Sequence, residues 1–504
     1  MKKLVLGYSR ALELRREPND FDAKQKGGFA AQVVARIFHN VATAIPCMED
    51  EVKELFDLAE TLCARVHHHR NAFQDLIADM RRKFVNTQLP VELERHAETF
   101  CRSLRHLWIE ASASTTSLDY RSPPTAHKTR TATGRNIEFG YERDLQPAYL
   151  EERCGRFFDP PPGGWTSDHV LLSSGQSAMG AVLHALEGGA WCGVDRKLTF
   201  VHLGSYFETA EIFSLFSSLL KPIARGRDAV KKIDKLDADV FIIEPVFCDG
   251  EFGCVDFDQL LNQHLRVPRR RVYIFDTTLT GSSYAIEKEL VRMKHLKNPV
   301  IFRLISGLKL LQGGMELSSV GVLTVFTPDD ATTPAKQLGD TIRKIRTLLG
   351  LGLSFADVGI LEAPWFLDRE YTEIYQHAIF DNNARLANAV EADNRVFRGT
   401  FHPSIIPHSP APRTAPYCVF RLQNDNCDGL VRLEKLLHCE TRKRGILLES
   451  GGSFGFRGHR FEIVRPEDGS EPFLRVALGR RPGWSCDQIT LLMSEVGSGR
   501  LALG

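Results

Sequence analysis

The sequence predicts an α/β fold with a mostly parallel central sheet flanked by helices, and three observations support this prediction. Short apolar runs alternate with helix-like segments between about residues 165 and 330, the pattern of a parallel sheet covered on both faces. Long amphipathic patterns without strand signals dominate residues 1–125, and shorter strand-like runs return after residue 392. We therefore expect a helical N-terminal extension before the sheet and a small α+β C-terminal domain after it.

Composition and charge exclude several classes of protein. The chain has 504 residues, with 64 Lys and Arg against 63 Asp and Glu, and this balance argues against nucleic-acid or anionic-membrane partners. The 11 cysteines include no Cys-x-x-Cys pair, so neither a disulfide framework nor a metal site is expected. Arg10, Glu13 and Arg15 interrupt the N-terminal apolar stretch before a signal peptide or membrane span could form. We expect a cytoplasmic protein.

The elements are expected in a definite order along four regions. Residues 1–125 form the helical extension, with amphipathic patterns over Glu49–Phe84 and Pro90–Glu110. A polar stretch containing Pro123 and Pro124 leads into residues 126–165, which we assign as a linker or arm. Residues 166–330 form the large α/β domain, and residues 331–504 form connecting helices to about Ala392 and the C-terminal domain. Strands of the large domain are expected at Val170–Leu172, Leu198–Leu203, Val240–Ile243, Val272–Phe275, Val300–Ile305 and Val320–Phe326.

The first motif follows the first of these strands. The run Val170–Leu172 leads into Ser174, Gly175 and Gln176, and a helix is expected to begin near Ser177. Gly allows close backbone approach, Ser adds a hydroxyl donor, and the helix N-terminus presents free N–H groups, which together suit a phosphate. An ordinary strand-to-helix turn capped by Ser explains the same residues equally well.

Two further strands end in residues that carry chemistry. Asp276 ends the run Val272–Phe275 at the edge of the sheet where open α/β sheets bind ligands, and it needs a cationic partner there. Lys309 follows the strand Val300–Ile305 in a Ser-Gly-Leu-Lys turn. A lysine in such a cleft can be desolvated and made nucleophilic, although most loop lysines are simply solvated.

The order and spacing of these motifs, about 100 residues from loop to Asp276 and about 30 more to Lys309, resemble a known family. The chain is similar, over roughly residues 135–500, to the fold-type I pyridoxal 5′-phosphate enzymes, and most closely to the Cys/Met-metabolism family of cystathionine γ-synthase, cystathionine γ-lyase and methionine γ-lyase. The resemblance implies that Lys309 forms the internal aldimine and that Asp276 keeps the pyridine nitrogen protonated. The cofactor phosphate would then bind Ser174, Gly175 and Gln176.

Other stretches match the family in the same order. The segment GSYFET resembles its Tyr-Gly-Gly-Thr stretch, which implies that Tyr206 stacks on the pyridine ring; a partly buried tyrosine at a sheet end is the alternative. Ser306 resembles the second phosphate-binding serine. The segment GYERDLQPA resembles the Tyr-x-Arg segment that reaches a neighbouring subunit, so Tyr141 and Arg143 would hold the partner's cofactor. This implies a homodimer or homotetramer.

The C-terminal segments ESGGSFGF and FLRVALG resemble the late strand pair of the family. Arg475 is thereby assigned to the substrate carboxylate and Ser453 to a contact nearby; a surface ion pair is the alternative for Arg475. Departures concern the surroundings of the cofactor, because Leu308 stands where the family has Thr and Cys248 or Asp249 lies near its Asn position.

Two other motifs suggest different chemistry, but their surroundings do not support it. Residues 451–455 match the GxSxG nucleophile elbow, but a loop and a strand are expected after Ser453 instead of the required helix. The triplet His67–His69 lies in a helical pattern, where consecutive side chains point in different directions, so it makes a poor metal site.

The implied activity is a pyridoxal-phosphate-dependent reaction on an amino acid. Lys309 would act as general base at Cα of the external aldimine while Arg475 orients the carboxylate. The family then implies γ-elimination or γ-replacement, a lyase or transferase reaction that makes or breaks a C–S, C–N or C–C bond at Cγ. S-adenosylmethionine is one candidate substrate, in specialised biosynthesis. An aminotransferase is the alternative, and a non-catalytic binding protein on this scaffold is the lower alternative.

Overall fold

The computed structural model describes residues 48–66, 68–87, 89–115, 122, 129–187, 198–216, 220–230, 232–406, 412–423, 427–466, 471–481 and 483–502. The expectations for residues 1–47, for His67 and for most of the polar stretch before residue 129 fall outside the described residues.

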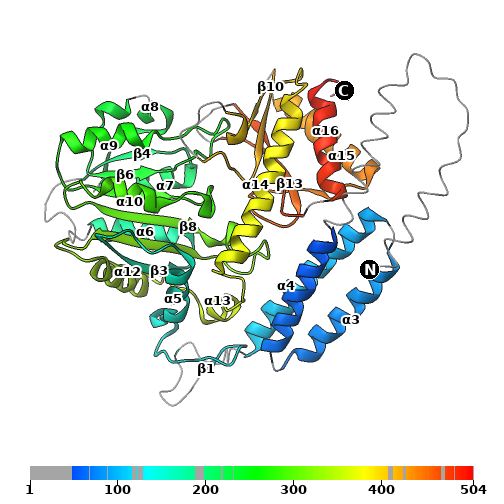
Figure 1. The fold of residues 1–504 in the computed structure, drawn as a ribbon, viewed down its shortest axis with the longest axis horizontal. Coiled ribbons are helices and arrows are strands. Elements are labelled where there is room, and N and C mark those ends of the chain that lie inside the picture. Colours follow the sequence, from blue (N-terminus) through cyan, green and yellow to red (C-terminus); the bar gives the residue numbers. More distant parts are fainter. Residues whose placement is uncertain are drawn as a thin grey trace, which may run out of the picture.

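A seven-stranded sheet forms the centre of the larger part of the molecule (Figure 1). Its strand order is β3-β9-β8-β7-β6-β4-β5, with parallel pairing from β8 through to β5 and antiparallel pairing of β9 with both neighbours. The strands are β3 Trp165–Leu172, β4 Leu198–Leu203, β5 Leu220–Arg225, β6 Val240–Ile243, β7 Val272–Asp276, β8 Val300–Ser306 and β9 Gly321–Pro328. Since β3, β4, β6, β7 and β8 run in the same direction, their carboxyl ends meet at one edge.

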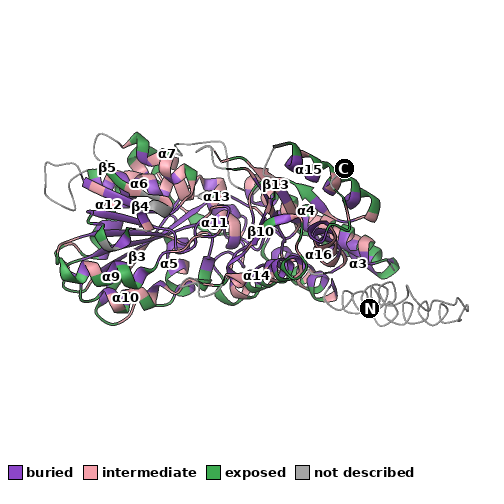
Figure 2. Ribbon diagram, turned by 90° about the horizontal axis from the view of Figure 1, so that it is seen from above, coloured by how far each residue is buried: buried purple, intermediate pink, exposed green. Residues whose placement is uncertain are grey.

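Helices cover both faces of this sheet because the strands are apolar on both sides. In β7, Ile274 faces a core shared with α6, α7 and α12, whereas Tyr273 and Phe275 face a core shared with α9 and α10. Such strands read as continuous apolar runs. Figure 2 shows the strands buried and the outer helix faces exposed. The covering helices are α5 Ala148–Phe157, α6 Gly175–Glu187, α7 Phe207–Leu215, α8 Gly226–Val230, α9 Phe257–Arg266, α10 Ile286–Met293, α12 Ala335–Leu349 and α13 Phe355–Ile360.

The N-terminal region is helical, as the sequence predicts, but the expected continuous pattern over Glu49–Phe84 is two helices. One runs over residues 48–65, and α3 (Arg70–Asn86) begins after a break that contains His68 and His69. The break lets the apolar sides of both helices and of α4 (Pro90–Thr115) face a single core. Met315 and Trp365 of the following regions belong to the same core, so the extension packs on the rest of the molecule.

The C-terminal part contains a five-stranded sheet of order β10-β11-β14-β13-β12. The expected long helical stretch to Ala392 is three helices, because Gly350 ends α12 in the left-handed conformation and Ser354 starts α13 with a capping box. The elements are α14 Arg369–Glu391, β10 Phe397–Phe401, β11 Cys418–Leu422, α15 Cys427–Arg444, β12 Leu448–Ser450, β13 His459–Val464, β14 Phe473–Ala477 and α16 Trp484–Gly497. None of the described helices combines the length and apolar character that a membrane crossing requires.

Candidate active site

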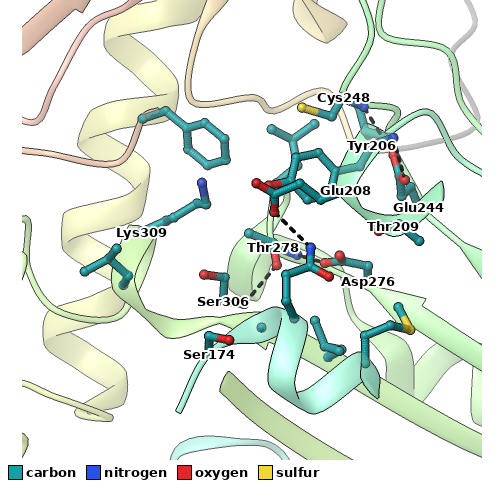
Figure 3. Close-up of a pocket in the computed structure, with 18 residues that line it drawn as sticks. Ser174, Tyr206, Glu208, Thr209, Glu244, Cys248, Asp276, Thr278, Ser306 and Lys309 are labelled. Atoms are coloured by element: carbon teal, nitrogen blue, oxygen red, sulfur yellow. Dashed lines mark hydrogen bonds between the residues drawn. The ribbon is translucent and has the colours of Figure 1, made fainter. Parts of the chain in front are cut away.

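Seven residues to which the sequence resemblance assigns contacts with the cofactor line one cavity of about 260 Å³ at the carboxyl edge of the central sheet (Figure 3). They lie just after β3, β4 and β8 or at the last positions of β7 and β8, so the parallel strands bring them together. They are Ser174, Gly175, Gln176, Tyr206, Asp276, Ser306 and Lys309.

Lys309 lies on α11 (Gly307–Leu310), one turn of helix that directly follows β8. Its Nζ donates a hydrogen bond to Ser453 Oγ at 3.0 Å and lies 4.7 Å from the centroid of the Phe454 ring. Burial lowers the pKa of Lys309, and the positive charge of Arg475 acts in the same direction. A lowered pKa increases the fraction of neutral amine, which is the form that acts as a nucleophile or a base.

The loop that carries Ser453 approaches the lysine very closely. Ser453 has a φ of 71° and Gly455 a φ of 85°, both in the left-handed region. A Cβ atom on Gly455 would lie 2.5 Å from the backbone oxygen of Lys309, so only glycine fits. The chain after Ser453 is a loop that leads to β13, and this geometry excludes a nucleophile elbow.

The N-terminus of α6 opens into the same cavity. The helix begins at Gly175, two residues earlier than the sequence suggested, and Ser177 N donates to Ser174 Oγ at 3.0 Å. A Cβ atom on Gly175 would lie 3.2 Å from Ser306 Cβ, so glycine allows helix and strand end to meet. The free N–H groups and hydroxyls at this junction suit an anion. Gln176 Oε1 is buried there without a hydrogen-bond partner among the described residues.

Asp276 ends β7 at the bottom of the cavity. Its Oδ1 accepts a hydrogen bond from Thr278 N at 3.0 Å, and Thr278 Oγ1 accepts one from Ser306 N at 2.9 Å. Burial raises the pKa of Asp276 to about 6, and the nearby negative charge of Glu244 adds to the shift. The carboxylate is therefore held in a position where a cationic ligand group would stabilise it.

We expect Asp276→Asn to stabilise the ligand-free protein. Because the folded-state pKa of about 6 exceeds the ordinary 3.8, the folded protein binds more protons than the unfolded chain between these values. As pH rises through this range, Asp276 becomes charged in its buried position and the folded wild-type protein loses stability. Asparagine stays neutral, so the variant does not suffer this loss. The variant should exceed wild type by about 1–2 kcal/mol above pH 6 in the free energy of unfolding, and the gain should shrink toward pH 4.

Urea titrations across this pH range measure the difference, with the exposed Asp330→Asn as the matched control. A variant that is less stable than wild type at pH 7 would contradict a penalty for the buried charge.

Tyr206 follows β4 and is held by two carboxylates that the sequence did not single out. Its hydroxyl donates to Glu208 Oε2 at 2.6 Å, and its backbone N–H donates to Glu244 Oε1 at 3.0 Å. Burial raises the pKa of Tyr206 well above its ordinary value, and the hydrogen bond to Glu208 adds to this. Glu244 directly follows the apolar run Val240–Ile243, so the rule that finds Asp276 also finds Glu244.

Glu244 is fixed by the structure around it. Burial acts to raise its pKa, but hydrogen bonds from His202 and from the backbone of Ser205 and Tyr206 outweigh burial and lower it. The His202 Nε2 to Glu244 Oε1 distance is 2.9 Å. A Cβ atom on Gly204 would lie 2.3 Å from Glu244 Oε1, so glycine makes room for this pair.

Of the two residues considered at the family's Asn position, the cavity contains Cys248. Its Sγ accepts a hydrogen bond from Tyr417 OH at 3.4 Å, and burial raises the pKa of the thiol. Asp249 instead accepts hydrogen bonds from the backbone of Glu251 and Gly253 in its own turn.

Arg475 lies on β14, outside the lining of the cavity. It forms an ion pair with Glu462 of β13, and its guanidinium carbon lies 5.1 Å from the centroid of the Tyr417 ring. The positive charge of Arg475 acts to lower the pKa of both Lys309 and Cys248, so the guanidinium lies close to the cavity. Its Nη2 pairs with Glu462, whereas its Nε is buried without a hydrogen-bond partner among the described residues. Its assignment to a substrate carboxylate stays a prediction.

Tyr141 and Arg143 also lie outside the cavity of their own chain. The Tyr141 side chain is exposed, and the guanidinium of Arg143 lies 5.5 Å from the centroid of the Tyr141 ring. Tyr141 directly precedes the short helical turn Glu142–Asp144 before α5, and Arg143 lies within that turn. Their role toward a second subunit stays a prediction.

Comparison with known proteins finds the fold but no close relative. No protein-family model and no curated protein sequence matches the chain. Among solved structures, a methionine γ-lyase from Micromonospora echinospora is 17% identical with a TM-score of 0.51, over 78% of this chain and 98% of the other. The metB protein of Corynebacterium glutamicum is 13% identical with a TM-score of 0.53, over the same shares. Yeast cystathionine γ-lyase is 12% identical with a TM-score of 0.51, again over 78% and 98%. The predicted fold is thus confirmed, and the chain has the fold-type I architecture of the cystathionine and methionine γ-lyases.

Proposed function

We propose that the chain is a pyridoxal 5′-phosphate-dependent enzyme that acts on an amino acid. The observation that carries this proposal is one cavity in which a lysine of lowered pKa, a buried strand-end carboxylate and a helix N-terminus occur together. The three features match the aldehyde, the pyridine nitrogen and the phosphate of this cofactor in chemistry. The orphaned Gln176 Oε1 further marks a place where a polar ligand is expected.

The residues that would hold the cofactor follow from this match. Lys309 would link to its aldehyde, Asp276 would face its ring nitrogen, and Tyr206 would pack against its ring. Ser174 and Ser306, with the N–H groups of α6, would bind its phosphate. When bound, the cofactor supplies a ring that withdraws electrons from the bonds at Cα of an attached amino acid.

The chain's own residues would then select and move a proton. Lys309 is suited to act as the base that takes the proton from Cα, because Ser453 positions its amine and burial lowers its pKa. Burial in the cavity limits water around the amine, which protects this transfer from competing protonation.

We further propose γ-elimination or γ-replacement as the reaction, with S-adenosylmethionine among the candidate substrates. Two of the structures reported above are named as γ-lyases, and the sequence resemblance supports the same chemistry. A homodimer or homotetramer completes this proposal, in which Tyr141 and Arg143 reach the neighbouring subunit. An aminotransferase uses the same residues and is the alternative that experiment must separate.

The test begins with pyridoxal phosphate added to the purified protein. We expect a visible absorption band, and after borohydride reduction we expect peptide mapping to find the cofactor on Lys309. A panel of amino acids that includes S-adenosylmethionine is then added. A released thioether or thiol supports γ-chemistry, whereas pyridoxamine phosphate after one half-reaction identifies an aminotransferase. Failure to take up the cofactor would overturn the proposal.

A further inference from the structure

One carboxylate in the cavity has no role in the chemistry proposed above. Glu208 is the second residue of α7, and its Oε2 accepts hydrogen bonds from Tyr206 OH at 2.6 Å and from Gln176 Nε2 at 3.0 Å. Both donors use the same oxygen, which leaves Oε1 for a ligand. Figure 3 shows the carboxylate directed into the cavity, and its negative charge raises the pKa of Lys309 against the effect of burial.

The other two carboxylates of the cavity already have roles. Glu244 receives hydrogen bonds from His202 and from three backbone N–H groups. Asp276 accepts a hydrogen bond from Thr278 N and is the carboxylate that the proposed function assigns to the cofactor's ring nitrogen. Among the lining residues that the structure describes, Lys309 is the one with a cationic side chain, and Ser453 holds its amine. Glu208 therefore presents a fixed negative charge toward whatever enters the cavity.

Glu208 is also a point at which this chain departs from the family stretch that it resembles. Glu208 stands at the second glycine of the Tyr-Gly-Gly-Thr stretch that GSYFET resembles. The hydrogen bonds from Tyr206 and Gln176 fix the carboxylate, so little side-chain freedom is lost when a ligand pairs with it.

We propose that Glu208 selects amino acids whose side chain carries a positive charge, such as a sulfonium, ammonium or guanidinium group. This inference rests on the proposed function, because it assumes that the cavity binds an amino acid. A cationic group beside Glu208 gains a Coulombic partner in a site shielded from bulk water. A neutral side chain of the same size leaves the carboxylate partly desolvated and unpaired, which opposes binding.

The experiment compares pairs of compounds that are similar in shape and differ in charge. S-adenosylmethionine is paired with S-adenosylhomocysteine, lysine with norleucine, and arginine with citrulline. Each is titrated into the cofactor-loaded protein, and the shift of the visible band gives an apparent Kd. In at least one pair, wild type should bind the charged member about tenfold more tightly, a difference in line with a partly shielded ion pair.

Glu208→Gln keeps the size of the side chain and should reduce this ratio by about tenfold. Glu211→Gln, an exposed residue one turn further along α7, should leave it unchanged. Equal binding of both members by wild type, or a ratio that survives Glu208→Gln, overturns the inference. If the Glu208→Gln variant does not fold, the ratio of the two apparent Kd values measured with wild type is sufficient to test the inference. A protein that takes up no pyridoxal phosphate refutes the proposed function and the inference together, whereas loaded protein without charge preference refutes only the inference.

Discussion

Lys309→Ala should abolish the visible band that the wild-type protein gains with pyridoxal phosphate. It should also lower the turnover of any amino acid that wild type converts by at least about 10²–10⁴-fold, the usual contribution of one acid–base group. Both effects follow from the loss of the same amine, which links the cofactor and receives the proton from Cα. Absorbance spectra and single-turnover kinetics measure them separately.

The fold of this variant should remain intact. Burial lowers the pKa of Lys309, so the folded site disfavours the charged amine, and the variant loses one hydrogen bond to Ser453. Lys336→Ala is the matched control, because that lysine is exposed and pairs only with its helix neighbour Asp340 among the described residues. Full turnover by Lys309→Ala would refute the assignment of this lysine.

The sequence predicts those site residues that lie close to a recognisable strand pattern. Asp276 directly follows the apolar run Val272–Phe275, and Lys309 lies four residues beyond the mostly apolar run Val300–Ile305. The direction of parallel strands then places both residues at one edge of the sheet. Glu244 directly follows the apolar run Val240–Ile243 and so gives the same signal. Glu208 gives no such signal, because it lies in the first turn of a helix whose approach to the cavity depends on how α7 packs.

Two of the strands that the sequence does not predict, β5 and β10, lie at the edges of the two larger sheets. β5 contains Pro222, which edge strands tolerate and which interrupts an apolar pattern. β10 contains Arg398 and Gly399 and also lies at an edge. Each of these strands depends on pairing with its one neighbouring strand, and the local amino-acid composition is a weak predictor of such pairing.

Contacts between distant segments are the other feature that the sequence does not reveal. Glu51 and Arg457 are 406 positions apart, yet both are fully buried and the Arg457 Nη1 to Glu51 Oε1 distance is 2.8 Å. Neither residue belongs to a motif. Only the packing of the N-terminal helices on the C-terminal sheet makes the pair, and this contact gives the extension a structural role.

Arg457→Met is expected to lower the free energy of unfolding by about 3–5 kcal/mol, the usual cost of removing one partner of a buried ion pair. Arg457 binds Glu51 and Glu54 of helix 48–65, and its Nε donates to Gly313 O at 3.0 Å, four residues beyond Lys309. Methionine fills the space but leaves Glu51 with fewer partners and leaves the Gly313 carbonyl without this donor.

The dependence of the free energy of unfolding on acidic pH provides a second measure of what the Glu51–Arg457 pair contributes. Burial acts to raise the pKa of Glu51, but Arg457, Arg480 and Arg481 outweigh it and lower the pKa to about 2. The pair therefore stabilises the protein above the ordinary pKa of 4.5, and this stabilisation is lost as pH falls toward 2. We expect wild type to lose more stability than Arg457→Met over that range.

Arg81→Met provides the matched control on the same helices. Arg81 pairs with Glu60 at 2.5 Å, but the two side chains are 60% and 52% exposed, so this pair should contribute no more than about 1 kcal/mol. Urea unfolding of both variants, monitored by fluorescence, compares a buried pair with an exposed one on a common background. If Arg457→Met costs no more than Arg81→Met, the buried network does not hold the extension to the rest of the molecule, and the apolar core around Met315 and Trp365 must do so alone.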